Sequence, residues 1–478
     1  MAEEIVLAVD LGAESGRVMG VHFDGRHLRT EEHHRFPNQT VFLNNTLHWN
    51  FLRLWEDIRG GIEKAKPLGP ASLGVDTWGV DFGLLDRQGT LIGNPVHYRD
   101  KRTDGMPEKA FAKVGRQAIF ENTGIQFMQI NTLYQLLSLV ESQSPLLSIA
   151  ETFLTAPDLL NYWLTGAKVC EFTNATTTQM LNARTGKWAT GLLADLDIPT
   201  HIFPEVVMPG TRIGAYEGIP VIAPACHDTG SAVAAVPATS PDFAYISSGT
   251  WSLVGLEVQE AIVSEAALAA NVTNEGGIAG TYRLLKNVMG LWILQQCRKT
   301  WADAGNSYSY ADLVEMAEAA PALRSVFDAN DPRFLPPGNH VQHIQNYCRE
   351  SKQPVLESPG EITRCILESL ALAYREVLSV LTGLQGKVVS AIHIVGGGSQ
   401  NTLLNQMTAD ATGLPVIAGP TEATVIGNAL VQLISLGAIG NIAEGRALVA
   451  QLPEIRTFRP ADKGRWDAAY ARVKELSR

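Results

Sequence analysis

The stretch AVDLGAESGRVMGVHF, residues 8–23, carries an aspartate at the end of an apolar run. A turn of small residues follows and ends in an arginine, after which a second apolar run begins. Two alternating apolar runs joined by a short turn are typical of a β-hairpin rather than of a helix. The sequence therefore predicts a hairpin with an unusual turn near the start of the chain.

The residues of this turn are suited to bind an anion. Gly12 and Gly16 allow close approach of the backbone to a ligand, and the side chains of Ser15 and Arg17 are donors. Asp10, at the end of the first strand, is placed to hold a hydrated Mg²⁺. The G-x-x-x-x-G-K-[ST] and G-x-G-x-x-G patterns are both missing from this turn. An ordinary tight hairpin with a solvated arginine explains the stretch equally well.

A second stretch of the same kind lies in the middle of the chain. It reads FAYISSGTWSLVGLEV, residues 243–258, and follows a Pro- and Ser-rich break, VPATSPD. Elsewhere strand patterns alternate with helical ones, which favours an α/β fold. Two similar hairpins, each opening one half of the chain, predict two related domains, residues 1–240 and 241–478. A length of 478 residues agrees with this division.

The composition limits the classes of partner. The chain is 45% hydrophobic and 18% charged, a composition typical of globular proteins. Its net charge of −11 argues against binding to nucleic acid or an anionic membrane. A phosphate compound would need local positive potential from backbone N–H groups, an arginine or a metal ion. The five scattered cysteines contain no C-x-x-C pair, so we expect reduced thiols in a cytoplasmic enzyme. Cys348 and Cys365 are the two that could meet across a loop.

The uncharged stretch at residues 423–443 is long enough to span a bilayer. Asn428, Gln432 and Asn441 interrupt it, and its glycines weaken it as an isolated helix. We expect a buried helix that packs closely at its glycines.

Three consecutive glycines occur in VGGGSQN, residues 395–401. They follow the strand pattern AIHI and precede a helical pattern. Glycine lets a flat or anionic ligand lie against the backbone, and ligands collect at the carboxyl ends of strands in α/β sheets. The context favours a ligand-binding loop over a mobile one.

Two further segments carry side chains suited to a sugar. In PACHDTGSAVAA, Asp228 precedes an apolar helical run, so it is either a helix N-cap or a general base for a sugar hydroxyl. His227 alone is better explained by packing. VDTWGVDF contributes Asp76, Trp78, Gly79 and Asp81, and HYRDKRT adds Arg99, Asp100 and Arg102. Carboxylates beside an aromatic surface and arginines are typical of a polyol site, although a solvated strand end with salt bridges is as good an interpretation.

Taken together, the motifs resemble those of the FGGY carbohydrate kinases, most closely the members that act on L-rhamnulose. The resemblance runs from the N-terminus to about residue 428. DTWGVDF, TNATTTQ and KNVMGLW are the stretches most particular to those members. The matching stretches are AVDLGAESGRVMG, DTWGVDFGLLD, YRDKRT, GIQFMQINTLYQL, PDLLNYWLTG, FTNATTTQMLN, HDTGSAV, SSGTWSLVG, NVTNEGG, LLKNVMGLW and HIVGGGSQNTLLNQMTADATGLPVIAGP.

The resemblance implies a two-domain actin- and hexokinase-like fold with ATP and sugar in an interdomain cleft. It implies transfer of phosphate from ATP to the C1 hydroxyl of L-rhamnulose, which gives ADP and L-rhamnulose 1-phosphate in L-rhamnose catabolism. ATP and Mg²⁺ are the expected cofactors. We expect a cytoplasmic monomer or small homo-oligomer with no nucleic-acid or membrane partner.

The resemblance also assigns roles to residues. Asp228 is the expected proton acceptor, and Asp10 is expected to hold Mg²⁺ through water. Glu14 departs from the family, which more often has Ser or Thr there. The expected ATP ligands are Ala13, Glu14, Ser15, Gly16, Arg17, Thr250, Gln295 and Gly397. The expected sugar ligands are Gly79, His227, Asp228, Thr229 and Asn287.

Other functions stay open at this point. A sister kinase for L-fuculose or xylulose would differ in its sugar pocket, especially at Trp78, Gly79, Asp81 and Asn287. An actin- or chaperone-like ATPase would hydrolyse ATP whatever the sugar. A catalytically silent sugar sensor would have lost the aspartate, which is present as Asp228.

Overall fold

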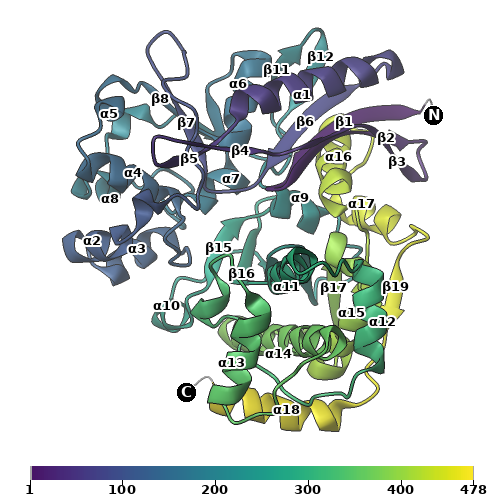
Figure 1. The fold of residues 1–478 in the computed structure, drawn as a ribbon. Coiled ribbons are helices and arrows are strands. Elements are labelled where there is room, and N and C mark those ends of the chain that lie inside the picture. Colours follow the sequence, from purple (N-terminus) through teal and green to yellow (C-terminus); the bar gives the residue numbers. More distant parts are fainter. Residues whose placement is uncertain (1–2, 477–478) are drawn as a thin grey trace. The chain divides into compact units, whose positions relative to one another are not determined.

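A computed structural model describes residues 3–476 of the chain (Figure 1). The chain forms two compact units. The first contains residues 3–239, Glu257–Leu284 and Ala423–Leu452, and the second contains Ser240–Leu256, Leu285–Glu422 and residues 453–476. The first unit therefore includes two segments that follow the expected boundary near residue 240.

The first unit contains both strands and helices, often in runs of one kind. Its strands are β1 (Glu4–Leu11), β2 (Ser15–Phe23), β3 (Leu28–Pro37), β4 (Thr40–Leu43), β5 (Thr46–Trp49), β6 (Ser72–Thr77), β7 (Phe82–Leu85), β8 (Thr152–Thr155), β9 (Val169–Glu171), β10 (Glu205–Val207), β11 (Arg212–Tyr216), β12 (Ile219–Ile222) and β15 (Thr273–Gly276). Its helices are α1 (Phe51–Ala65), α2 (Met106–Lys113), α3 (Arg116–Thr123), α4 (Thr132–Glu141), α5 (Pro145–Ile149), α6 (Ala156–Thr165), α7 (Phe172–Thr177), α8 (Thr190–Asp195), α9 (Asp228–Ala234), α10 (Glu265–Ala270), α16 (Ala423–Ser435) and α17 (Ile442–Val449).

Within the described residues, twelve strands and helices lie wholly or for the most part in the second unit. They are β13 (Phe243–Ser248), β14 (Ser252–Val258), β16 (Tyr282–Val288), α11 (Trp292–Asp303), α12 (Tyr310–Ala319), α13 (His340–Glu350), α14 (Pro359–Gln385), β17 (Ala391–Val395), α15 (Thr402–Thr412), β18 (Val416–Ala418), β19 (Arg456–Phe458) and α18 (Lys463–Leu476). Short 3₁₀ turns occur at η1 (Lys66–Leu68), η2 (Lys101–Thr103), η3 (Thr200–Ile202), η4 (Pro332–Phe334) and η5 (Gly397–Gln400).

Both predicted hairpins are present, and each starts a sheet in the same way. β1 pairs antiparallel with β2 and parallel with β6, whereas β13 pairs antiparallel with β14 and parallel with β17. The strand order is β3-β2-β1-β6-β12-β11 in the first unit and β16-β14-β13-β17-β18-β19 in the second. The α/β class and the repeat of a hairpin beside a parallel strand are confirmed.

Helices cover both faces of the first sheet. Apolar residues of β1 and β6, such as Leu7 and Val75, belong to a core shared with α1 and α6, whose Phe51 and Trp163 meet edge to face. α1 begins where the sequence predicts it, because the Asn50 side chain accepts a hydrogen bond from the backbone N–H of Arg53.

On the other face of the sheet lies α16, the predicted buried helix. Its polar residues are hydrogen-bonded to the strands: Gln432 donates to the carbonyl of Leu7 over 2.9 Å and accepts from Ser72 Oγ over 2.6 Å. Gly427 permits the close packing expected, because a Cβ there would lie 1.7 Å from the carbonyl oxygen of Ser231 in α9. Within residues 3–476, every helix is too short or too polar to cross a membrane.

The second unit is built around α14, a long helix predicted from its apolar face. Ser358 and Glu361 form a capping box at its start, and Gly386 ends it with a φ of 71°. Tyr374 of α14 makes a 2.7 Å hydrogen bond with Ser252 of β14, which joins the helix to the sheet. All five cysteines of the chain are free and buried, as expected of reduced thiols.

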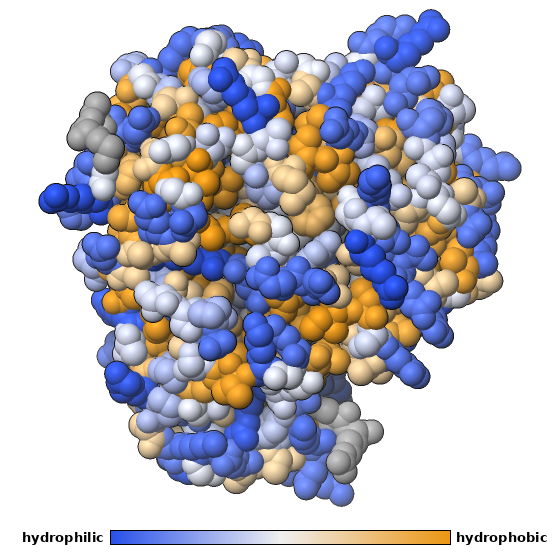
Figure 2. Space-filling view, turned by 180° about the vertical axis from the view of Figure 1, so that it is seen from behind, coloured by the Kyte–Doolittle hydropathy of each residue, from blue (hydrophilic) through white to orange (hydrophobic). Residues whose placement is uncertain are grey.

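The surface mixes polar and apolar side chains. Figure 2 shows hydrophilic side chains spread between smaller hydrophobic areas on one side. Three consecutive exposed hydrophobic residues, Val41, Phe42 and Leu43, form most of β4. The other exposed large hydrophobic residues in the described part of the chain occur singly, which is normal in folded proteins.

A buried carboxylate fixes the turn between β6 and β7. Asp81 Oδ2 accepts hydrogen bonds from the indole N–H of Trp49 over 2.5 Å and of Trp78 over 3.0 Å, and Gln135 donates to Oδ1 over 3.1 Å. The two indole rings lie with their centroids 4.1 Å apart. Asp81 is 1% exposed, and this burial raises its pKa to about 6. The carboxylate is thus an anchor for aromatic side chains.

Neighbouring glycines of α1 give the first testable prediction. A Cβ on Gly61 would lie 2.4 Å from Val18 Cγ2, whereas a Cβ on Gly60 would meet nothing within 4 Å. We expect Gly61→Ala to lower the free energy of unfolding by about 1–3 kcal/mol through overpacking. Gly60→Ala should raise it by about 0.5–1 kcal/mol, since alanine favours the helix. Urea unfolding of both variants checks this; equal stabilities would contradict the packing.

The carboxyl of Asp81 gives a pH prediction. Its pKa is about 6 in the fold against 3.8 for the ordinary group, so the folded chain holds this proton more tightly than the unfolded chain. The stability that the proton contributes is fully present below the ordinary value and is lost as the pH rises through the folded value. Between pH 3.8 and about pH 6 this group alone lowers the free energy of unfolding by roughly 3 kcal/mol.

Asp81→Asn removes this dependence. We expect the wild type to lose stability relative to Asp81→Asn between about pH 4 and about pH 6, and the difference to stay constant at higher pH. Urea unfolding of both proteins across that range measures it. Parallel pH profiles for the two proteins would show that Asp81 does not titrate there.

Candidate active site

The first carboxylate of the candidate site, Asp10, is the last residue but one of β1 and pairs with Arg17 of β2. The two residues are cross-strand partners in the hairpin. Arg17 Nε and Nη2 donate to Asp10 Oδ2 over 2.9 and 2.7 Å. Asp10 is 6% exposed, so the arginine compensates a largely buried charge. The predicted hairpin therefore brings a carboxylate and a cation together where its two strands enter and leave the turn.

The turn itself divides into an open part and a packed part. Ala13 and Glu14 are exposed and Ser15 is half-buried. Gly16 is buried, and a Cβ there would lie 2.4 Å from Leu11 and Phe36 side-chain atoms. Packing against Phe36 therefore requires a glycine at position 16, whether or not its backbone N–H meets a ligand. A Cβ on Gly12 would come no closer than 3.4 Å to another atom, so that position stays open.

A second carboxylate, Asp76, lies beside Asp10 because β1 and β6 pair in parallel with these two residues in register. Asp76 is completely buried, and Asn428 of α16 donates to its Oδ2 over 2.6 Å. Burial and the adjacent charge of Asp10 hold the pKa of Asp76 well above its ordinary value. Its Oδ1 has no hydrogen-bond partner among the described residues.

Asp228 is the first residue of α9, and its side chain is 29% exposed. The N-cap of this helix is His227, so the N-cap alternative for Asp228 is wrong. Asp228 Oδ1 instead accepts from the backbone N–H of Thr229 over 2.5 Å and from its hydroxyl over 3.1 Å. Burial raises the pKa of Asp228; His227 opposes the shift in part and the charge of Asp10 adds to it. This carboxylate is open on one side and disposed to take a proton.

His227 joins Asp228 to a buried ion pair. Its Nε2 lies 3.5 Å from Asp228 Oδ1, while its Nδ1 lies 3.3 Å from Glu275 Oε2. Arg283, which is fully buried, contacts His227 Nδ1 over 3.0 Å and Glu275 over 3.2 Å. A guanidinium only donates, so Nδ1 accepts where it bonds to Arg283, and in that tautomer the ring proton lies on Nε2, toward Asp228.

Gly79 lies in the turn that Asp81 anchors. The neighbouring Val80 has a φ of 69°, which is rare for a β-branched residue. Asp76 and Asp81 have separate partners, Asn428 for one and the two indoles for the other. The expectation that these carboxylates and Trp78 form one polyol site is therefore wrong, because each carboxylate is buried with donors of its own.

The arginine-rich stretch after β7 is largely structural. Asp100 Oδ1 accepts from Arg102 N over 2.9 Å and its Oδ2 accepts from Leu47 N over 2.8 Å. Arg102 donates to Gln135 over 2.6 Å and stacks on Phe82. Arg99 stacks on Tyr98, with 5.5 Å from its guanidinium carbon to the ring centroid. Asp100 and Arg102 thus fold the loop.

In the second unit, the structure brings two of the expected nucleotide ligands together. Gln295 of α11 donates to Thr250 Oγ1 in the turn of the β13–β14 hairpin over 3.2 Å. Gly290 has a φ of 59°, and a Cβ there would lie 2.6 Å from the backbone of Trp251. The close approach of the Gly290 backbone to the hairpin therefore fixes this arrangement.

The glycine loop after β17 also contains open and packed positions. Gly396 has a φ of 83°, and a Cβ on Gly398 would lie 2.0 Å from Ser248 Oγ. Gly397 is exposed and has nothing within 4 Å of its Cβ position. Because β13 and β17 are parallel neighbours, the loops with Thr250 and Gly397 leave the same edge of the sheet.

Asn287, the remaining expected sugar ligand, lies on β16 and is half-buried. It shares this strand with Arg283. Thr229 is buried at the start of α9, next to Asp228.

The residues around Asp10 fit a magnesium ion held through water. Among residues 3–476, no group of three or more His, Cys, Asp or Glu side chains is arranged to hold a metal ion directly. Mg²⁺ usually keeps several waters and binds one or two carboxylates together with substrate phosphates. Asp10, with Asp76 and its unpartnered Oδ1 in the next strand, supplies such oxygens.

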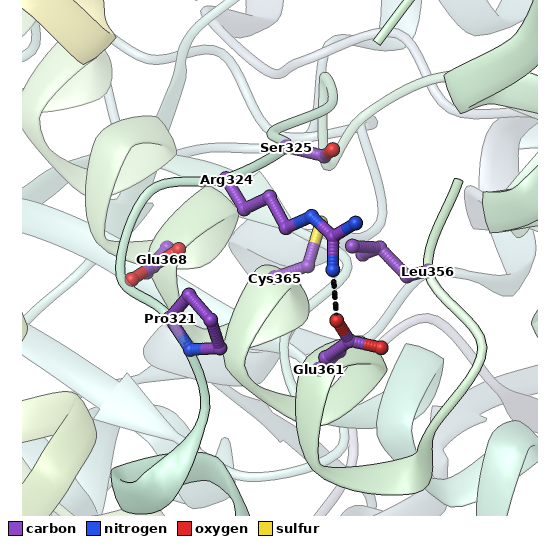
Figure 3. A pocket seen from close by; sticks show the side chains of 7 residues that line it. All are labelled: Pro321, Arg324, Ser325, Leu356, Glu361, Cys365 and Glu368. Atoms are coloured by element: carbon purple, nitrogen blue, oxygen red, sulfur yellow. Dashed lines mark hydrogen bonds and ion pairs between the residues drawn. The ribbon is translucent and has the colours of Figure 1, made fainter. Parts of the chain in front are cut away.

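A pocket at the start of α14 contains none of these residues (Figure 3). Its charged groups are paired: Arg324 with Glu361, and Glu368 with Arg364 over 2.8 Å. It is lined by Pro321, Arg324, Ser325, Leu356, Glu361, Cys365 and Glu368. A pocket whose charges are satisfied internally offers little to a phosphate or a sugar.

Sequence reasoning missed Glu275 and Arg283. Glu275 lies in the motif NVTNEGG, which carries the resemblance but was given no role. Both residues are buried charges, and buried charges are rare unless they are paired. An acidic and a basic residue on successive strands in the sequence are the only signal for this pair.

Comparison with known proteins assigns the family. The model of the N-terminal domain of the FGGY family of carbohydrate kinases matches residues 5–232, and that of the C-terminal domain matches residues 244–436. A rhamnulokinase from Bacteroides thetaiotaomicron is 43% identical over 98% of this chain and 99% of its own length. A rhamnulokinase from Pectobacterium carotovorum is 44% identical over 100% of this chain and 97% of its own length.

Solved structures show the same fold at lower identity. Xylulose kinase from Rhodospirillum rubrum has a TM-score of 0.79 at 19% identity, over 99% of this chain and 98% of that chain. Gluconate kinase from Lactobacillus acidophilus has a TM-score of 0.78 at 16% identity, over 99% and 96%. The chain belongs to the FGGY family of carbohydrate kinases and is an ATP:sugar phosphotransferase.

Proposed function

We propose that this kinase phosphorylates L-rhamnulose at its C1 hydroxyl and releases L-rhamnulose 1-phosphate and ADP. The observation that carries the choice of sugar is the similarity over the full length to proteins named rhamnulokinase. The geometry around Asp228 supports the reaction class, since phosphoryl transfer depends on positioning and charge stabilisation with one group that accepts the hydroxyl proton.

Asp228 is the proposed catalytic base. Its carboxylate is partly exposed, and its pKa is raised above the ordinary value. A base of raised pKa takes the hydroxyl proton more readily as the phosphoryl group transfers. His227, with its ring proton on Nε2, is proposed to donate to the sugar or to Asp228 and so to fix the direction of the carboxylate.

The remaining assignments are proposals of the same kind. Gly79, Thr229 and Asn287 are proposed sugar contacts, and the backbone and side chains of residues 13–17 are proposed phosphate contacts. In the second unit, Thr250, Gln295 and Gly397 are proposed nucleotide contacts; the bond between Thr250 and Gln295 and the open face of Gly397 support this.

Mg²⁺ is the proposed metal, held by Asp10 through water. When bound, it neutralises phosphate charge. Arg17 neutralises Asp10 before the nucleotide arrives and is near enough to the turn to serve the phosphates afterwards. Because ATP is the phosphate donor, we propose a cytoplasmic location, where the five free thiols also stay reduced.

A sugar panel tests the function. ADP release is measured with MgATP and, in turn, L-rhamnulose, L-fuculose, D-xylulose, L-ribulose and glycerol. We expect kcat/KM for L-rhamnulose to exceed that for each other sugar by about tenfold or more, the effect of at least one lost or misplaced hydrogen bond. Preference for another ketose would overturn the sugar, and ADP release that ignores every sugar would overturn the reaction.

Replacement of the base tests Asp228. We expect Asp228→Ala to lower kcat by roughly a hundredfold or more, since a positioned base contributes on that scale. Binding of MgADP, measured by calorimetry, should stay unchanged. Asp195→Asn, at an exposed position of α8, is the control and should retain wild-type kcat. Near-normal transfer by Asp228→Ala would remove Asp228 from the role of base.

A further inference from the structure

The segment Glu171–Thr177, made of the end of β9 and all of α7, is buried although most of its side chains are polar. Thr173 and Asn174 are fully buried, and Thr176 and Thr177 are 5% exposed. Buried polar side chains need hydrogen-bond partners, and these side chains bond mainly to the backbone of other segments. None of the residues of this segment is among the proposed site residues. We call it the α7 segment.

Thr177 contacts the turn that carries Gly79. Its Oγ1 accepts the backbone N–H of Val80 over 3.0 Å and donates to the carbonyl of Asn174 over 2.8 Å. A Cβ on Gly79 would lie 2.9 Å from the same Oγ1. Thr177 therefore lies directly against the Gly79–Val80 peptide.

The conformation of this turn needs such support. Val80 is β-branched and has a φ of 69°, in the left-handed region. Its carbonyl accepts from Thr132 Oγ1 over 2.6 Å and from Gln135 over 3.1 Å. Residues held in sparsely populated conformations persist where the surroundings over-determine them, and they cluster at ligand sites. Thr177 is the residue whose side chain accepts the backbone N–H of Val80.

Thr173 contacts the segment that carries the base. Its Oγ1 accepts the backbone N–H of His227 over 3.1 Å and donates to Glu171 Oε2 over 2.6 Å. Glu171 Oε2 also accepts the N–H of Cys226 over 3.0 Å. The two peptides that precede Asp228 are thereby fixed from the α7 segment.

Asn174 and Thr176 complete the network. Asn174 Nδ2 donates to the carbonyls of Trp78 over 3.2 Å and Cys226 over 3.4 Å, so one amide joins both site segments. Thr176 Oγ1 accepts the N–H of Gly276 over 2.8 Å, next to Glu275, which pairs with His227. The buried α7 segment therefore forms hydrogen bonds to three stretches that are far apart in the sequence.

We propose that Thr177 and Thr173 are positioning residues of the sugar site. Thr177 sets the place of the Gly79 backbone and so governs sugar binding, whereas Thr173 sets the direction of Asp228 and so governs transfer. The inference rests on the proposed function for the roles of Gly79 and Asp228. It adds that sugar binding and transfer depend on buried hydroxyl groups that hold the backbone of the site segments in place.

Thr177→Val and Thr178→Val are a matched pair for the test. Thr178 is 1% exposed, donates to the carbonyl of Ala175 and accepts from Met180 N, so its hydroxyl bonds to residues within three positions in the chain. Both substitutions replace a hydroxyl by a methyl group of similar size. Only Thr177→Val removes a bond to the Gly79–Val80 peptide.

Steady-state kinetics with the sugar that the wild type prefers supply the readout. We expect Thr177→Val to raise KM for the sugar about five- to tenfold, the effect of one lost hydrogen bond, with KM for ATP within about twofold of wild type. Thr178→Val should change both by less than about twofold, and Thr177→Ser, which keeps the hydroxyl, should restore sugar KM. Thr173→Val should lower kcat by a similar factor, and Thr173→Ser should restore it.

Several outcomes would overturn the proposal. These are a Thr177→Val enzyme with unchanged sugar KM, equal effects of Thr177→Val and Thr178→Val, a parallel rise in KM for ATP, and a Thr177→Ser variant as impaired as Thr177→Val. If Thr177→Val does not fold by circular dichroism, Thr173→Val and Thr173→Ser decide the matter through kcat. A wild type that prefers another ketose overturns the choice of L-rhamnulose only, because the variants are then compared on that ketose.

Discussion

Parallel pairing between the first strand of a hairpin and a strand that comes much later in the chain is the constraint on which both units depend. Parallel strands place their carboxyl ends at the same edge of a sheet, where α/β proteins bind ligands. In the first unit this pairing sets Asp10 beside Asp76, and in the second it sets the turn with Thr250 beside the glycine loop with Gly397. Turns that are remote in sequence thus become neighbours.

This arrangement crowds carboxylates at the edge of the first sheet, and each is accommodated differently. Asp10 is paired with Arg17. Asp76 has its pKa raised by burial and by Asp10, and it accepts from Asn428. Asp228 stays partly open and keeps a raised pKa. Asp10 is neutralised by Arg17, Asp76 keeps one oxygen without a hydrogen-bond partner among the described residues, and Asp228 is the carboxylate most open to solvent.

The glycine-rich loops combine two physical requirements. Gly16 and Gly398 are glycines because a side chain would overlap Phe36 in one case and Ser248 in the other. Gly397 is a glycine with open space beside it, as a contact with a flat or anionic ligand requires. The three glycines look alike in the sequence. Only their neighbours in space show which of them is required by packing and which is open to a ligand.

The amino-acid sequence by itself determined the local elements. The two hairpins, the capped start of α1 at Asn50, the long helix that ends at Gly386 and the buried helix with Gly427 all follow from patterns within some thirty residues, because strand alternation, helical period and capping are local. The site residues came from motifs compared with a known family. The sequence left open whether Asp76 and Asp81 share a polyol site or form a solvated strand end, since it shows which charges are near in the chain but not which donors meet them.

Only the tertiary structure decided the partners. The bond from Val80 to Thr177 spans 97 residues, that from Arg283 to His227 spans 56, and that from Asn428 to Asp76 spans 352. A buried polar group must be satisfied by whatever the fold brings to it, and the register of distant strands and helices sets that choice. No local pattern in the sequence encodes it. The motifs therefore predicted which side chains carry the chemistry of the site. The partners that hold those side chains in place are set by the tertiary structure alone.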